Sequence, residues 1–173
     1  MPAKRLKDRL LKPVYEIHVL GGPNLNMLGF CEPEIYGTET LEDLEGKMRA
    51  AAKESPNRVK LFFFQTNYEG EMLEYIHSLA LGSAARGQLS GIIANFAAWT
   101  HTSIALRDAM MMLRPIPLVE VQLSNTPEQD EFRQYSLLED LADYRVVGSG
   151  LQGYVEALRW MLAEAKKDRL DVH

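Results

Sequence analysis

The chain has 173 residues, enough for one ordinary domain with a substantial core, and 46% of them are hydrophobic while 25% are charged. No apolar run approaches the roughly 20 residues that span a bilayer, and the net charge of −5 gives no general attraction to phosphate backbones or anionic lipids. These features exclude membranes and nucleic acid as expected partners. The single cysteine, Cys31, rules out an intrachain disulfide and a cysteine-based metal cluster, so we expect a cytoplasmic protein.

Residues 1–14 form a basic N-terminal segment. No continuous apolar segment with a small-residue cleavage site follows it, so it does not have the pattern of a secretion signal. We expect an arm over residues 1–14 and a single domain over residues 15–173.

The first half of the chain alternates strand and helix patterns. Tyr15–Leu20 predicts a strand, and the Gly- and Pro-rich loop over residues 22–37 has the length of a lid or binding loop. Thr40 is a predicted N-cap, and Val59–Phe64 predicts a second strand buried on both faces. Asn67 or a neighbour is expected to cap a second helix. The helix that follows Thr40 has the apolar stripe Leu41, Leu44, Met48 and Ala51 or Ala52. The second helix has the apolar stripe Met72, Ile76, Leu79 and Ala80.

The second half continues this alternation after a predicted loop over residues 82–88. Residues 92–94 predict a third strand and residues from 104 a third helix, separated by a polar joint over 95–103. A fourth strand begins at about residues 116–118, and a second polar joint covers 122–133. Tyr144–Val147 predicts a short fifth strand, and the last helix has the stripe Val155, Leu158, Met161, Leu162 and Ala165.

The segment Gly91–Asp108 has two interpretations that its residues leave open. In a parallel α/β sheet, loops at the carboxyl ends of strands line the crevice where small ligands bind, which would direct His101 and its neighbours at a ligand. Alternatively, Thr100 or Thr102 caps the following helix and His101 is a solvated residue of its first turn.

The regular alternation predicts an α/β fold, a flavodoxin-like three-layer sandwich with a five-stranded parallel sheet. No G-x-G-x-x-G follows the first strand and no Walker-type motif is present. A dinucleotide or ATP site therefore lacks its usual sequence mark.

Several collinear motifs identify a family. From Tyr15 to near the C-terminus the chain resembles type II 3-dehydroquinate dehydratase. The motifs are residues 22–29 (GPNLNMLG), 32–37 (EPEIYG), 65–71 (QTNYEGE), 100–108 (THTSIALRD), Glu120-Val121, Ser124-Asn125 and 131–133 (EFR). The resemblance implies a flavodoxin-like fold, trimers that form a dodecamer, a small cyclic carboxylic acid as ligand, and no metal or organic cofactor.

The reaction that the resemblance implies is an anti elimination of water through an enolate. Tyr36 matches the base of the family, which needs a nearby cation because a free tyrosine has a pKa of about 10. The family has an arginine for this purpose immediately before the Glu-Pro, where this chain has Cys31. The proton donor of the family is the histidine of a Glu-Val-His motif that matches Glu120 to Gln122. An amide cannot deliver a proton.

The ligand-binding positions of the family are better preserved. Asn95 matches the residue that positions the enolate water, and His101 and Arg133 match groups that hold ring hydroxyls. The backbone of Leu123 and Ser124 matches the cradle for the carboxylate. Two further matches are Asn24, in the motif that supports the site, and Asp108, which matches a residue that the family offers across a subunit contact.

Three hypotheses follow from this combination. The first is a lyase that acts through Tyr36 on 3-dehydroquinate or a close relative, with weakened dehydration. The second is a non-catalytic protein that binds a cyclic acid or serves in assembly. The third is an enzyme with a changed reaction in which Tyr36 or Cys31 has a new role, although an ordinary loop thiol is the simpler interpretation of Cys31.

Overall fold

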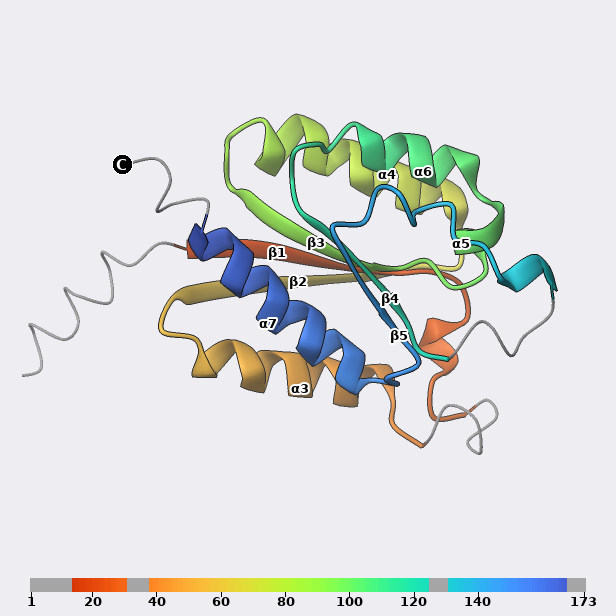
Figure 1. The fold of residues 1–173 in the computed structure, drawn as a ribbon, viewed down its shortest axis with the longest axis horizontal. Helices are drawn as coiled ribbons and strands as arrows, with labels where there is room; N and C mark the ends of the chain where they lie inside the picture. Colours follow the sequence, from red (N-terminus) through yellow and green to blue (C-terminus); the bar gives the residue numbers. More distant parts are fainter. Residues whose placement is uncertain (1–13, 31–37, 125–130, 168–173) are drawn as a thin grey trace, which may run out of the picture.

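A five-stranded, fully parallel sheet forms the centre of the computed structural model, which describes residues 14–30, 38–124 and 131–167 (Figure 1). The strand order β2-β1-β3-β4-β5 is that of the flavodoxin-like fold and confirms the predicted class. The strands are β1 (Val14–Gly21), β2 (Arg58–Gln65), β3 (Leu89–Asn95), β4 (Leu118–Gln122) and β5 (Tyr144–Val147). Of the predicted N-terminal arm, residues 1–13 lie outside the described residues.

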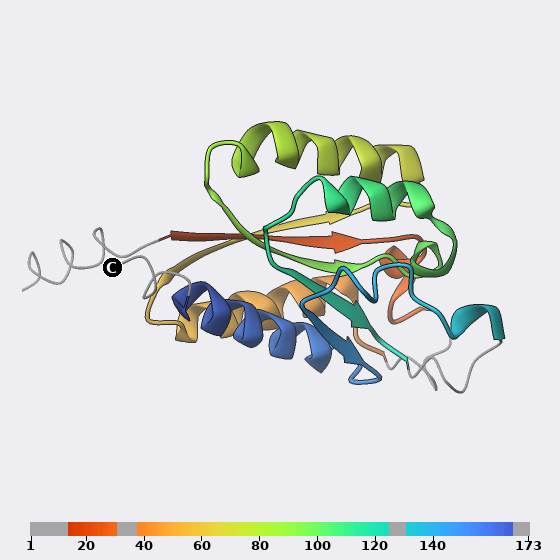
Figure 2. The same cartoon turned by 45° about the horizontal axis from the view of Figure 1, so that its top comes forward.

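Helices cover both faces of the sheet and give three layers (Figures 1 and 2). One layer contains α3 (Leu41–Glu54) and α7 (Gln152–Lys167), and the other contains α4 (Glu69–Leu79), α5 (Trp99–Thr102) and α6 (Ile104–Met111). The shorter helical turns are η1 (Leu25–Met27), η2 (Ala80–Ala84) and η4 (Glu131–Arg133). Because side chains alternate along a strand, β1 contributes Ile17 and Val19 to the core under α3 and α7, and Leu20 to the core under α4 and α6.

The second strand is not buried on both faces, contrary to the sequence prediction. β2 is an edge strand that pairs only with β1 among the described strands, and 41% of the Phe62 surface is exposed. Phe62 stacks on His18 at 4.7 Å between ring centroids, and Phe64 stacks on Tyr75 at 4.1 Å. Aromatic residues are favoured on edge strands as well as on central ones when neighbouring rings cover them. The three consecutive Phe residues therefore did not indicate whether the strand is central or at the edge of the sheet.

Helix α3 begins where the sequence predicted. Thr40 is its N-cap, and a complete capping box joins Thr40 and Asp43: the Asp43 N–H donates to Thr40 Oγ1 at 3.2 Å and the Thr40 N–H donates to Asp43 Oδ2 at 2.9 Å.

Helix α4 begins beside Asn67 and α6 begins at residue 104, as predicted, but the cap residues are Tyr68 and Ser103. Tyr68 occupies the N-cap position of α4, while Asn67 Oδ1 instead accepts from the Asn24 N–H at 2.8 Å. The cap of α6 is Ser103, whose hydroxyl oxygen accepts from the Leu106 N–H at 2.9 Å. Thr100 and Thr102 lie inside the separate short helix α5. The predicted loop over residues 82–88 is also shorter than expected, because η2 continues the helical path to Ala84.

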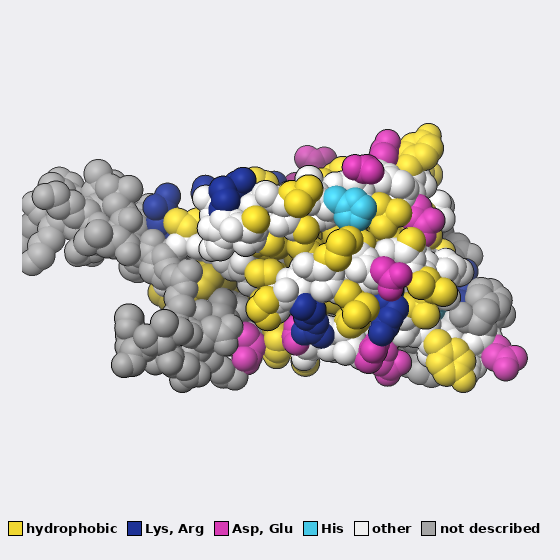
Figure 3. Space-filling view, turned by 90° about the horizontal axis from the view of Figure 1, so that it is seen from above, with side chains coloured by type: hydrophobic (Ala, Val, Ile, Leu, Met, Phe, Trp, Pro, Cys, Tyr) yellow, Lys and Arg dark blue, Asp and Glu magenta, His cyan; other side chains and the backbone are white. Residues whose placement is uncertain are grey.

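The outer surface of α6 is unusually apolar. Ile104, Met111 and Met112 are 65%, 50% and 56% exposed, and Asp108 lies between them at helical spacing. We call Ile104, Asp108, Met111 and Met112 the α6 stripe. Figure 3 shows the face that carries α4 and α6, with hydrophobic side chains scattered over it. No helix of the described residues is long and apolar enough to cross a membrane.

Candidate active site

The carboxyl ends of β1 and β3 meet where the strand order reverses. The Gly22 N–H donates to the Asn95 carbonyl oxygen at 2.8 Å, and a Cβ added to Gly22 would lie 2.3 Å from the Phe96 carbonyl oxygen. Only glycine permits this approach of the two chain segments. In open parallel sheets this switch point is where ligands bind, so the predicted residues Asn24 and Asn95 lie in the expected region.

The Asn95 side chain is held firmly at the end of β3. It is 4% exposed, and its Oδ1 accepts from the Ala97 N–H at 3.1 Å. It also contacts the Tyr154 hydroxyl of α7; burial raises the pKa of Tyr154, and the contact with Asn95 offsets part of that shift. This turn requires a left-handed backbone at Ala97, where φ is 49°. Asn95 is therefore a preorganised polar group.

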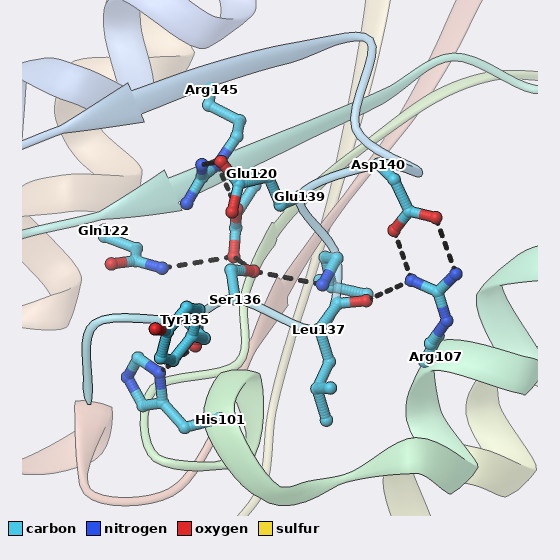
Figure 4. A network of polar contacts seen from close by, with 11 residues as sticks. His101, Arg107, Glu120, Gln122, Tyr135, Ser136, Leu137, Glu139, Asp140 and Arg145 are labelled. Atoms are coloured by element: carbon cyan, nitrogen blue, oxygen red, sulfur yellow. Dashed lines mark hydrogen bonds and ion pairs between the residues drawn. The ribbon is translucent and has the colours of Figure 1, made fainter. Parts of the chain in front are cut away.

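A buried ion pair lies beside Gln122 at the end of β4 (Figure 4). Glu120 is fully buried and accepts from Arg145 Nε at 2.6 Å, from Gln122 Nε2 at 3.2 Å and from the Ser136 hydroxyl. Arg145 also pairs with Glu139 at 2.8 Å. The candidates Glu120 and Gln122 are thus brought into direct contact, and Glu120 faces a permanent cation.

His101 faces a chain segment that is fixed by several hydrogen bonds (Figure 4). Its Nδ1 donates to the Tyr135 carbonyl oxygen at 2.6 Å, and the Leu137 N–H donates to the Thr100 carbonyl oxygen at 2.9 Å. Arg107 donates to the Leu137 carbonyl oxygen and to Asp140. Because a carbonyl can only accept, neutral His101 carries its proton on Nδ1 and its Nε2 is an acceptor. His101 is half-buried, so it is not simply a solvated helix residue.

The remaining predicted residues are more dispersed. Leu123 and Ser124 follow β4 and are half-buried, and the Gly150 N–H donates to the Leu123 carbonyl oxygen at 3.1 Å. Arg133 ends η4, and Asp108 is exposed on α6. Cys31 and Tyr36 lie outside the described residues. In the described part of the chain no group of three or more His, Cys, Asp or Glu side chains could hold a metal ion.

The sequence prediction missed Arg145 and Ser136. Arg145 lies on β5 opposite Glu120 in the parallel register, although 25 positions separate the two residues in the chain. A signal was available: each is a lone charge inside a short apolar strand, LVEVQ and YRVV. Because buried charges are usually paired, two such strands of opposite charge predict a contact once they are known to be neighbours.

Comparison with known proteins agrees with the fold and the motifs. Residues 15–162 match the family model described as dehydroquinase class II. The chain belongs to the class II dehydroquinase family. The match extends from β1 into α7 and contains every candidate site residue.

Relatives in this family are similar over nearly their whole length. A 3-dehydroquinate dehydratase of Streptomyces avermitilis is 41% identical over 155 residues, which are 90% of this chain and 92% of the relative. That of Hyphomonas neptunium is 46% identical over 147 residues, 85% of this chain and 90% of the relative. The crystal structure of a type II dehydroquinase from Butyrivibrio crossotus has a TM-score of 0.76 and 35% identity, and the match covers 85% of this chain and 97% of that one.

Proposed function

We propose that this class II dehydroquinase binds 3-dehydroquinate, or a closely related cyclic hydroxy acid, at the carboxyl ends of β1, β3 and β4, and dehydrates it slowly. Family membership supports the lyase reaction and the ligand class. The proposal of a reduced rate is supported by Gln122, a buried amide that contacts Glu120 and lies at the position that matches the proton donor of the family.

The proposed reaction starts at Tyr36, which removes a proton beside the ketone to give an enolate. The hydroxyl then leaves and takes up a proton to become water. Cys31 carries no charge that would make Tyr36 more basic, and Gln122 has no proton to give, so solvent must supply it. Loss of general acid catalysis alone typically lowers a rate by about 10²–10⁴.

The ligand would be held by the residues that match the binding positions of the family. Asn95 is preorganised by its hydrogen bond to Ala97, and His101 by its hydrogen bond to Tyr135. Leu123, Ser124 and Arg133 would bind the carboxylate and a ring hydroxyl, and Asn24 would support the loop through its contact with Asn67. The same substitutions at Cys31 and Gln122 also favour the second candidate function, a homologue that binds a cyclic acid without turnover or with a changed reaction.

We further propose self-association, as trimers that form a dodecamer. Supporting this, the α6 stripe exposes large apolar side chains around Asp108, the residue that matches one offered across a subunit contact. Exposed apolar surface of this kind is typical of protein–protein contacts.

The experiment that tests the reaction restores the two substituted groups. We expect 3-dehydroquinate to raise the melting temperature of the wild-type protein while absorbance of the enone product shows slow turnover. The double variant Cys31→Arg/Gln122→His is expected to raise kcat by about 10²-fold or more, because it returns a cation and a proton donor. Full-rate dehydration by the wild-type protein, or a double variant that binds the acid and gains nothing, would contradict the proposal.

A further inference from the structure

One end of the Gln122 amide has no partner. The residue is 8% exposed, and its Oε1 is a fully buried side-chain oxygen without a hydrogen bond, a state shared within the described residues only by Thr100 Oγ1. The other end is engaged, since Nε2 donates to Glu120 Oε1. Leaving a buried carbonyl unsatisfied is unfavourable, so such an oxygen points to a donor supplied from outside the protein.

The direction of this amide follows from the groups around Glu120. Arg145 is permanently protonated and donates to Glu120 Oε2, so Glu120 is the carboxylate partner of this ion pair. A carboxylate can only accept hydrogen bonds. Gln122 must then present its NH2 group to Glu120, and its carbonyl oxygen must face the other way, as Figure 4 shows. The assignment of oxygen and nitrogen in the amide is thus decided by its partner.

We propose that Gln122 Oε1 accepts a hydrogen bond from the tertiary hydroxyl of the bound cyclic acid, and that Glu120 and Arg145 are positioning residues that fix the amide in this direction. The inference rests on the proposed function, because the match of Gln122 to the proton-donor position places it beside that hydroxyl.

This direction has a chemical consequence. A hydroxyl that donates its hydrogen to a carbonyl gains electron density on oxygen, whereas departure as water requires that oxygen to receive a proton. Gln122 therefore selects for the hydroxyl as a recognition group and works against its expulsion. A histidine at the same position would do the reverse.

The test compares two ligands that do not react. Quinate has no ketone to acidify the neighbouring proton, so it reports binding alone. In its analogue, fluorine replaces the tertiary hydroxyl; fluorine is similar in size, accepts weakly and cannot donate. Both dissociation constants are measured by titration calorimetry on the full-length protein.

We expect the wild-type protein to bind quinate about tenfold more tightly than the fluoro analogue, the usual effect of losing one hydrogen bond to a buried acceptor. Gln122→Met keeps the side-chain length and removes the acceptor, so the two affinities should become equal. Glu120→Gln keeps the shape of the network. In this variant the new amide at position 120 turns its oxygen to Arg145 and its NH2 group to Gln122, which reverses the Gln122 amide. The preference for quinate over the fluoro analogue should then fall to less than about threefold.

Circular dichroism and thermal melting check that both variants fold. Equal affinity of the wild-type protein for the two acids, or a preference that survives in Gln122→Met, would overturn the assignment while leaving ligand binding intact. A preference unchanged in Glu120→Gln would overturn the role of the ion pair. If neither acid binds the wild-type protein, the proposed function itself fails, and this result is distinct from the others.

Discussion

At the scale of single residues, Ala97 occupies a backbone conformation that favours glycine. Its φ of 49° lies in the left-handed region, which costs a residue with a Cβ about 1–2 kcal/mol. The strain is maintained by the hydrogen bond from the Ala97 N–H to Asn95 Oδ1. Orientation of Asn95 therefore has a cost in backbone strain.

Ala97→Gly is expected to leave the free energy of unfolding unchanged or to raise it, because relief of strain offsets the greater entropy of the unfolded chain. The matched control is Ala98→Gly. Ala98 has φ −60° and ψ −32° at the start of α5, so glycine there should lower the free energy of unfolding by roughly 0.5–1 kcal/mol. Urea denaturation measures both, and equal losses would show that Ala97 is not strained.

The ion pair of Glu120 and Arg145 gives a second prediction. Arg145→Met leaves a fully buried carboxylate without its cation and should lower the free energy of unfolding by about 3 kcal/mol at neutral pH. The double variant Glu120→Gln/Arg145→Met should recover much of this loss because no buried charge remains. As a control, Arg159→Met removes an exposed pair with Glu54 and should change stability by less than about 0.5 kcal/mol. Equal losses in the single and double variants would refute this account.

At the scale of elements, Arg107 joins α6 to the segment that follows η4. It donates to Asp140 and to the Leu137 carbonyl oxygen. In the same segment, the Ser136 hydroxyl donates to Glu120 and the Tyr135 carbonyl oxygen accepts from His101. The position of two candidate site residues thus depends on one polar connection between elements.

The pH dependence of this connection can be predicted. The hydrogen bond from Arg107 lowers the pKa of Asp140 from 3.8 to about 2. A carboxyl group with a lowered folded-state pKa stabilises the fold above its unfolded value, and this contribution is lost as the pH falls from about 4 through 2. Carboxyl carbon shifts measured by NMR should show Asp140 titrating near pH 2, and near its ordinary value in Arg107→Met.

Asp43 provides an internal reference for that titration. Its pKa is lowered by its hydrogen bonds with Thr40 in the capping box, which does not involve Arg107. The titration of Asp43 should therefore be the same in the wild-type protein and in Arg107→Met. A shift of both groups would indicate a general loss of structure.

At the scale of the whole molecule, the α6 stripe provides a test of the proposed self-association. Met111→Lys places a charge in this apolar surface and should shift the protein from the proposed assembly to smaller species in sedimentation velocity. Leu81→Lys is the control, since Leu81 is 84% exposed outside the stripe and its replacement should leave the sedimentation coefficient unchanged. Wild-type protein that sediments as a monomer would contradict the proposed self-association.

Much of the architecture was predictable from the sequence because its signals are local. The helical spacing of Leu44 and Met48 predicted the buried face of α3, and Thr40 predicted where α3 starts. These signals, like those for the strand Tyr144–Val147, depend on side chains within a few positions of each other. The parallel sheet followed from the alternation of such segments. The family motifs likewise named Asn95, His101 and Gln122 as site candidates.

Tertiary structure decided what depends on distant neighbours. It made β2 an edge strand that exposes Phe62, joined Arg145 of β5 to Glu120 of β4, and directed the Gln122 oxygen away from that pair. The physical reason is that burial, ion pairing and the direction of an amide depend on which strands lie side by side. Local sequence determines that a strand forms, but only the folded sheet determines which charge it meets.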